Sequence, residues 1–183
     1  MGLFDKIFKK KEEEKEYDPM NIRVTHLNKG FVLDYDLQSW VVKEVYEYDL
    51  GEGHFVYEYK LDNGADQCYL SVDEQADDLV LTMVKKIKIR ALDEDLPEYI
   101  IDNEAPPKKI VYDNVTYLLG NETPCYFRNI DHGADEWSEL ISWDYSDKDD
   151  KLYLCVEQWG EKEFEASIGR YVKEFQISNI VPK

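Results

Sequence analysis

Short runs in which large apolar residues alternate with polar ones dominate this chain. The clearest is FVYEYKL at residues 55–61. A period of two places successive side chains on opposite faces, which is the geometry of a β-strand. The same pattern predicts further strands, at residues 31–34, 39–47, 68–72 and 80–89. The sequence DNG at residues 62–64 predicts a hairpin turn, so the expected fold class is all-β.

The second half of the chain repeats the pattern of the first half. The sequence YDNVTYLL at residues 112–119 matches YDLQSWVV, 77 residues earlier, in its Tyr, Asp, hydroxyl, aromatic and aliphatic positions. Two later blocks match at separations of 84 and 88 residues, in the same order along the chain. Chance similarity in a chain rich in Tyr and Asp is the alternative, but three ordered blocks favour duplication. We therefore predict two tandem strand-rich modules, barrel- or sandwich-like, related by a pseudo-twofold axis.

The composition divides the chain into four expected segments. They are an amphipathic helix with a charged stalk at residues 1–19, a first β-module at 20–92, an acidic linker at 93–107 and a second β-module at 108–183. The linker is expected because acidic residues and prolines replace the alternating pattern there.

Apolar residues at helical spacing, followed by lysines, mark the N-terminus. The residues are Leu3, Phe4, Ile7, Phe8, Lys9 and Lys10. An apolar face beside a basic edge is typical of a helix that lies on a membrane surface. Residues 1–16 are therefore expected to dock on a membrane or on an unknown protein partner, with disorder as the alternative. No secretory signal is recognised, so the expected location is cytoplasmic, with peripheral attachment to the inner face of the membrane.

Charge and motif content exclude several functions. The chain has 40 acidic and 22 basic residues, a formal charge of −18, which repels the phosphate backbone of nucleic acids. Its three cysteines lack CxxC spacing and its three histidines are scattered, so no metal site and no cofactor are expected. Nucleotide-binding and nucleophile motifs are absent from the sequence, which makes an enzyme the less favoured reading.

Four residues are candidates for a site. Glu58 and Glu139 lie among apolar residues in predicted strands, where burial would raise the pKa of a carboxyl group and suit it to acid–base work. Trp137 and Trp159 are near loops inserted in the second half and could stack on a small ligand. The alternatives are that both glutamates face solvent and that both tryptophans pack in the core.

Several segments together carry a resemblance to a known family. They are residues 55–61 with 69–73, residues 136–140 with 153–157, the sequence EQW at 157–159 and the sequence EASIG at 165–169. Over residues 27–178 the chain resembles the bacterial domain of unknown function 4178 family. The first half departs from the family pattern by having Tyr57 where Trp is usual and no glycine in its last strand. The resemblance implies a bacterial cytoplasmic protein encoded near membrane-stress and phage-shock-type genes, and it implies no activity.

The leading hypothesis is therefore a non-catalytic binding or scaffold module linked to membrane or envelope stress, recruited through residues 1–16. The alternatives are a small-ligand-binding β-barrel, or a hydrolase that uses Glu58 and Glu139 as a pair.

Overall fold

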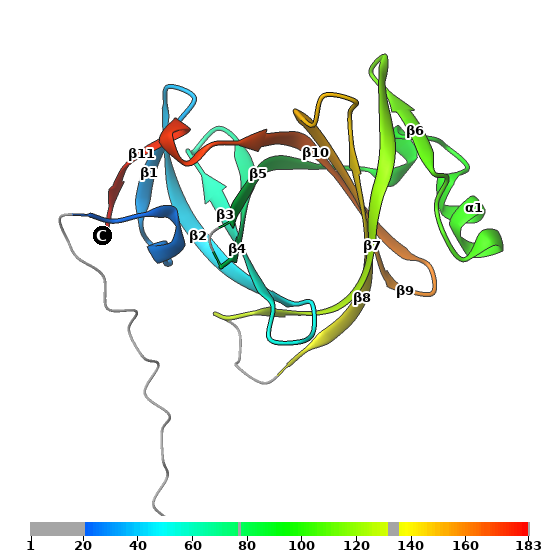
Figure 1. Ribbon diagram of the computed structural model, residues 1–183, viewed down its shortest axis with the longest axis horizontal. Helices are drawn as coiled ribbons and strands as arrows, with labels where there is room; N and C mark the ends of the chain where they lie inside the picture. Colours follow the sequence, from blue (N-terminus) through cyan, green and yellow to red (C-terminus); the bar gives the residue numbers. More distant parts are fainter. Residues whose placement is uncertain (1–20, 77, 132–135, 183) are drawn as a thin grey trace, which may run out of the picture.

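The computed structural model describes residues 21–76, 78–131 and 136–182, and strands dominate it (Figure 1). The strands are β1 (Val32–Tyr35), β2 (Gln38–Asp49), β3 (Phe55–Asp62), β4 (Gln67–Gln75), β5 (Asp78–Ile87), β6 (Lys109–Tyr112), β7 (Val115–Asn129), β8 (Ser138–Ser146), β9 (Leu152–Gly160), β10 (Glu163–Val172) and β11 (Ile177–Val181). The helices are α1 (Leu96–Asn103) and three 3₁₀ turns, η1 (Val24–His26), η2 (Ile89–Ala91) and η3 (Glu174–Gln176). The predicted all-β class is confirmed.

Eight of the strands close into an antiparallel ring, called the barrel below. Its order is β2-β3-β4-β5-β10-β9-β8-β7, and β7 pairs back with β2. Figure 1 looks down the axis of this ring. Strands β1 and β11 extend from one side of β2, and β6 extends from β7. Closure satisfies the backbone hydrogen bonds that an open sheet would leave along its edges.

The two long strands, β2 and β7, each change partner halfway along one edge. The beginning of β2 pairs with β1, and its end, from Tyr46 to Asp49, pairs with β7. In the same way, the beginning of β7 pairs with β6 before its end pairs with β2. Each strand carries a bulge between these parts, between Val42 and Glu44 in β2 and between Leu119 and Asn121 in β7. An extra residue in a strand moves the following side chains to the other face.

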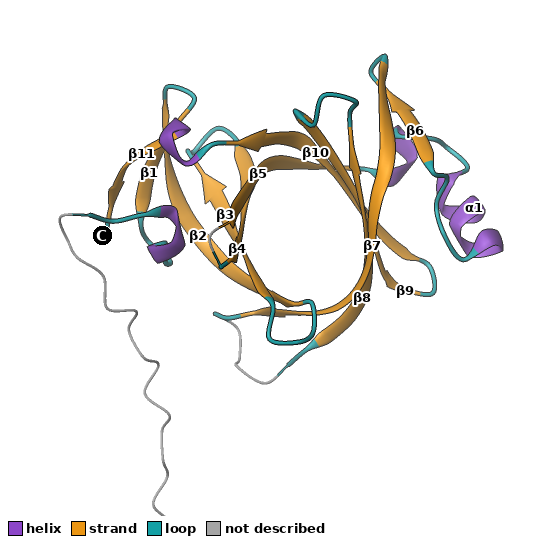
Figure 2. Cartoon of the chain, viewed as in Figure 1, coloured by secondary structure: helices purple, strands orange, loops and turns teal. Residues whose placement is uncertain are grey.

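Two apolar clusters lie on the outer face of the barrel wall. The first outer cluster packs η1, β1 and β11 against β2 to β5, and its largest fully buried members are Tyr59, Leu33, Leu61 and Leu70. The second outer cluster packs α1, β6 and η2 against β7 to β10, and it contains Trp143, Tyr145, Leu154 and Ile100. Figure 2 shows the helices outside the ring of strands. The main apolar packing is therefore outside the barrel.

The segment 93–107, expected to be a linker, contains the helix α1. Its residues Leu96 and Ile100 are one helical turn apart and are buried in the second outer cluster. Pro97 is in the first turn, where a missing backbone N–H costs nothing. The acidic residues of this stretch occupy the exposed side of a packed helix, so composition alone suggested a linker.

Turns and separations refine the sequence predictions. The predicted turn at residues 62–64 joins β3 to β4, and Gly64 has a φ of 90°, a region that favours glycine. Strands β1 and β6 begin 77 residues apart, and β5 and β10 begin 85 residues apart, so the tandem repeat stays a prediction. The predicted N-terminal helix lies outside the described residues.

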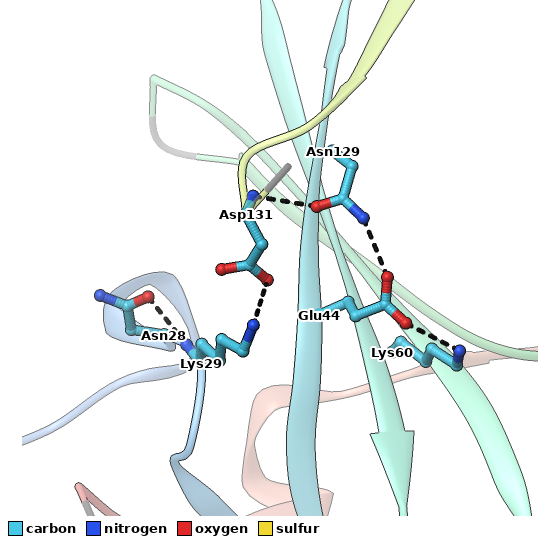
Figure 3. A network of polar contacts seen from close by, with 6 residues as sticks. All are labelled: Asn28, Lys29, Glu44, Lys60, Asn129 and Asp131. Atoms are coloured by element: carbon cyan, nitrogen blue, oxygen red, sulfur yellow. Dashed lines mark hydrogen bonds and ion pairs between the residues drawn. The ribbon is translucent and has the colours of Figure 1, made fainter. Parts of the chain in front are cut away.

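Polar contacts join the halves of the chain where β2 meets β7. Glu47 is buried, forms an ion pair with its cross-strand neighbour Arg128, and accepts a hydrogen bond from Tyr57 at 3.0 Å. Beside it, Glu44 accepts hydrogen bonds from Lys60 at 2.8 Å and from Asn129 at 2.9 Å (Figure 3). Charge-assisted hydrogen bonds of this kind fix the register of a strand pair.

Lys29 and Asp131 form a further ion pair, at 3.3 Å, beside the Glu44 contacts (Figure 3). Lys29 follows η1 and Asp131 follows β7, so the contact ties the N-terminal covering segment to the end of the second long strand.

Candidate functional site

The interior of the barrel contains a cavity of about 300 Å³, lined by side chains from all eight strands of the ring. The strand alternation that buries apolar side chains outside turns polar ones inward. In β9, for example, Leu154 and Val156 pack in the second outer cluster, while Tyr153, Cys155 and Glu157 line the cavity. The bulges have the same effect in β2 and β7, because Tyr48 and Asn121 face inward only after the bulge.

Two carboxyl groups, from Glu58 of β3 and Glu157 of β9, face this cavity. Burial raises the pKa of Glu58 to about 7, Lys86 partly opposes this shift, and Glu165 adds to it. Burial together with the charge of Glu58 raises the pKa of Glu157 to about 8. The surface that each side chain still exposes is turned toward the cavity. Each of the two acids therefore takes up or releases its proton near neutral pH.

One hydroxyl group serves both carboxyls. Tyr48 donates a long hydrogen bond, 3.4 Å, to Glu157, and the same hydroxyl lies near enough to Glu58 to lower the pKa of that carboxyl. Within the described part of the chain, no other side chain donates a hydrogen bond to either acid. A hydroxyl has a single proton to donate, so one of the two carboxyls is left without a donor at any moment.

Lys86 of β5 is the basic residue among the described residues that line the cavity. Its ammonium group forms an ion pair with Glu165 of β10 and lies 5.1 Å from the centre of the Tyr69 ring. Glu165 is the direct cross-strand neighbour of Glu157. The positive charge of Lys86 is therefore already balanced by Glu165.

A second polar group lies deeper along β8 and β9. Tyr153 donates a hydrogen bond to Asp144 at 2.5 Å, and the Ser142 hydroxyl lies 3.2 Å from the Cys155 sulfur. Burial raises the pKa of Asp144, while hydrogen bonds from Tyr153, Cys155 and Ser142 oppose the shift. Burial also raises the pKa of the Cys155 thiol well above its usual value, which makes it a poor nucleophile.

Four aromatic residues, Tyr46, Tyr48, Phe127 and Trp159, form an aromatic cluster beside the cavity. The Phe127 ring centre is 5.1 Å from that of Tyr48, 5.4 Å from that of Tyr46 and 4.8 Å from that of Trp159. These separations are typical of favourable aromatic pairs. The indole nitrogen of Trp159 is buried and has no acceptor among the described residues. The aromatic cluster meets the cavity through Tyr48, which lines it.

The structure places the two predicted acids on opposite faces of the wall. Glu58 lines the cavity, whereas Glu139 is exposed on the outer face of β8. The reason is the alternation in β8, where Ser142 and Asp144 face inward and the odd-numbered residues face outward. The expected pairing of Glu58 with Glu139 across a twofold axis does not occur in this structure.

The predicted tryptophans also lie apart. Trp137 is 37% exposed, and the guanidinium group of Arg128 stacks 4.6 Å from its ring centre. Trp159 is half-buried and belongs to the aromatic cluster. The predicted docking residues Leu3, Phe4, Ile7, Phe8, Lys9 and Lys10 lie outside the described residues, so recruitment through residues 1–16 stays a prediction.

Glu157 is the site residue that sequence reasoning missed. The run LYLCVE at residues 152–157 shows two faces, one apolar and one carrying Tyr, Cys and Glu. Alternation separates these faces, but it does not say which one encloses a cavity, since both faces of the barrel wall are covered. The repeat offered a signal, because it aligned Glu157 with Asp73, which also lines the cavity.

Two negative findings concern residues 21–76, 78–131 and 136–182. No helix there is both long and apolar enough to cross a membrane. Nor do three or more His, Cys, Asp or Glu side chains group there in a way that could hold a metal ion.

The fold and the site define a mainly β protein in which a closed ring of antiparallel strands surrounds a cavity lined by acidic, other polar and apolar side chains. The domain of unknown function family DUF4178 matches residues 28–174, and the chain belongs to this family. An uncharacterized protein of Aquifex aeolicus (strain VF5) is 26% identical over 187 residues, with 100% of both chains covered. No solved structure matches the chain. The resemblance noted in the sequence is thereby confirmed.

Proposed function

We propose that this protein binds a small molecule in the cavity of its barrel. The observation that carries the proposal is a cavity of about 300 Å³ inside the barrel, whose wall holds the carboxyls of Glu58 and Glu157 beside the Tyr48 hydroxyl. Pockets for small molecules start at about this volume and present a few well-placed polar groups. The proposal corresponds to the small-ligand-binding barrel that the sequence left as an alternative.

The cost of the polar interior supports a binding role. Small barrels usually fill their interior with apolar side chains, and polar groups without partners destabilise a fold. Here Glu58 and Glu157 have raised pKa values because burial disfavours their charged forms. Groups kept in an unfavourable environment inside a cavity are frequent at functional sites. Catalysis by Glu58 with Glu139 is not part of the proposal, because the wall separates these side chains.

We also propose that the barrel arose by duplication and that both copies build one site. The halves have the same element order, and the bulges in β2 and β7 fall at positions 77 residues apart. Glu58 comes from the first half and Glu157 from the second. A ligand between them would therefore contact both halves, and neither half alone would hold it.

The test is a screen of small polar metabolites by thermal unfolding of the full chain and of a blocked variant. Ser71 lines the cavity directly opposite Glu58 in the neighbouring strand, so Ser71→Phe fills space beside the acid. A molecule that binds the cavity should raise the melting temperature of the wild-type protein and not that of Ser71→Phe, since only a bound ligand stabilises the folded state.

The matched control is Thr116→Phe, which adds the same side chain to an exposed position of β7 away from the cavity. This variant should keep the wild-type response. Molecules that stabilise Ser71→Phe as much as the wild type would bind elsewhere and contradict the proposal. A cavity that accepts no molecule in the screen would also contradict it.

A further inference from the structure

The cavity wall has an excess of acidic groups over basic ones. Among the described residues that line the cavity, Glu58, Asp73, Asp144 and Glu157 are acidic and Lys86 is basic. Lys86 is already paired with Glu165, and Asp73 already accepts a hydrogen bond from His54 at 2.7 Å. An anionic ligand would therefore meet repulsion without a free cation to offset it.

The unmet hydrogen-bonding capacity at Glu58 and Glu157 is capacity for donors. Each carboxylate can accept several hydrogen bonds, yet Tyr48 supplies the single hydroxyl proton that the two share. The Tyr48 oxygen can itself accept a hydrogen bond from a ligand. The partner that the ionised pair lacks is a group that donates several hydrogen bonds.

The surroundings of the pair favour a positive charge on that donor. Tyr48 belongs to the aromatic cluster, with the Phe127 ring centre 5.1 Å from its own. Aromatic rings attract cations, and hydrogen bonds to charged groups are roughly twice as strong as those between neutral ones. The space of about 300 Å³ restricts the ligand to a small molecule.

We infer that the ligand carries a protonated amine, whose N–H groups bind between the carboxylates of Glu58 and Glu157 beside the Tyr48 hydroxyl. This inference rests on the proposed function, because it names the chemistry of the molecule that the cavity holds. Lys86 and Glu165 remain paired with each other at the edge of the site and keep the local charge balance.

Binding of a cation should release protons. Near neutral pH, Glu58 and Glu157 hold protons in the empty cavity, because their pKa values are about 7 and about 8. A bound ammonium favours the ionised carboxylates, so affinity rises with pH from about 6 to about 9, below the pKa of an alkylamine. The other titratable groups that face this pair come from all the remaining strands of the ring. They are Tyr46 and Tyr48 of β2, Tyr69 of β4, Lys86 of β5, Cys125 of β7, Asp144 of β8, Cys155 of β9 and Glu165 of β10.

The experiment compares three matched sets of probes by isothermal titration of the full chain. Each set contains an amine, an alcohol and a carboxylate on the same butyl, hexyl or phenylethyl group. The amines should bind at least about tenfold more tightly than the matched alcohols, because one hydrogen bond to a charged group contributes about this much affinity. The carboxylates should not bind. Titration at pH 7 in buffers of different ionisation enthalpy should show roughly one proton released per bound amine.

Three substitutions locate the charge. Glu58→Gln and Glu157→Gln keep the shape of the side chain and remove its charge, so each should weaken amine binding by about tenfold and reduce proton release. Glu139→Gln removes the same charge from the outer face of β8 and should change neither quantity.

The outcomes separate the ligand class from the proposed function. If alcohols or carboxylates bind as tightly as the amines and Ser71→Phe abolishes their binding, the cavity is a binding site but the amine assignment is wrong. If amines bind equally to Ser71→Phe, they bind outside the cavity, and both proposals fail for these probes. An absence of binding by all nine probes overturns the amine assignment.

Discussion

Ser142 and Trp143 are neighbours in β8, yet their side chains lie on opposite faces of the barrel wall. Trp143 is completely buried in the second outer cluster, and Ser142 lines the cavity. Around the ring, apolar side chains pack outward beneath the covering segments, whereas the inward side chains include both polar groups and the apolar Val56, Val80 and Val84. The apolar packing that stabilises this barrel therefore lies mainly on its outer face, and its inner face has room for a ligand.

Trp143→Ala should have the largest effect on stability. The side chain is fully buried, and its indole nitrogen donates a hydrogen bond to Glu122 at 3.1 Å. Its removal should lower the free energy of unfolding by about 3 to 5 kcal/mol, whereas Ser142→Ala on the inner face should cost less than about 1 kcal/mol. Urea unfolding followed by far-ultraviolet circular dichroism measures both. Equal costs would show that the two faces do not differ in this way.

Gly169→Ala should destabilise the protein strongly even though residue 169 lies on the inner face of the barrel wall. A Cβ atom at Gly169 would lie 1.9 Å from the Met83 carbonyl oxygen of the adjacent strand, so β5 and β10 would have to separate. We expect a cost of roughly 3 kcal/mol, as for other forced overpacking. Gly120→Ala is the control, since its Cβ would lie at an ordinary 3.6 Å from the Asp144 carbonyl oxygen. A tolerated Gly169→Ala would place the halves further apart than the structure does.

Glu157→Gln, a change on the inner face, should make the folded protein more stable than the wild type at high pH. The pKa of Glu157 is about 8 in the folded protein against 4.5 as a free side chain, so the folded state binds the extra proton between these values. The wild-type protein therefore loses stability as the pH rises through this range, while Gln resembles the protonated acid throughout. The variant should equal the wild type near pH 4.5 and exceed it by about 2 kcal/mol near pH 9.

The readout for this prediction is urea unfolding across that pH range. Glu139→Gln, on the exposed outer face, should follow the wild-type pH profile. A Glu157→Gln profile parallel to that of the wild type would mean that burial does not raise the pKa of this acid.

Strands were predictable because alternation is a local property. The run at residues 55–61 became β3, and the turn at 62–64 was found from its residue types. The bulges were not predictable, because nothing distinguishes Lys43 from its neighbours in sequence. Because the bulge positions were unknown, the side chains of β2 and β7 could not be assigned to the inner or the outer face. The residues that line the cavity could therefore not be identified from the sequence.

The site was predicted only in part for a related reason. Glu58 was identified from its apolar neighbours, but Glu139 has similar neighbours and faces outward. A pattern of period two assigns residues to two faces, and only the closure of the ring decides which face surrounds the cavity. The helix α1 was missed because the six acidic residues of the segment 93–107 hide the two apolar residues, Leu96 and Ile100, that anchor the helix.

The closure of the ring has a consequence for how the chain folds. The ring closes only when the end of β2 meets the end of β7 and when β5 meets β10, and both pairings join segments about 80 residues apart. Contacts between distant segments slow folding, and during synthesis the first half emerges before its partners exist. Until then β2 and β5 present open edges on which another chain could add a strand. The half-made barrel is therefore exposed to strand addition by other chains for the time needed to translate its second half.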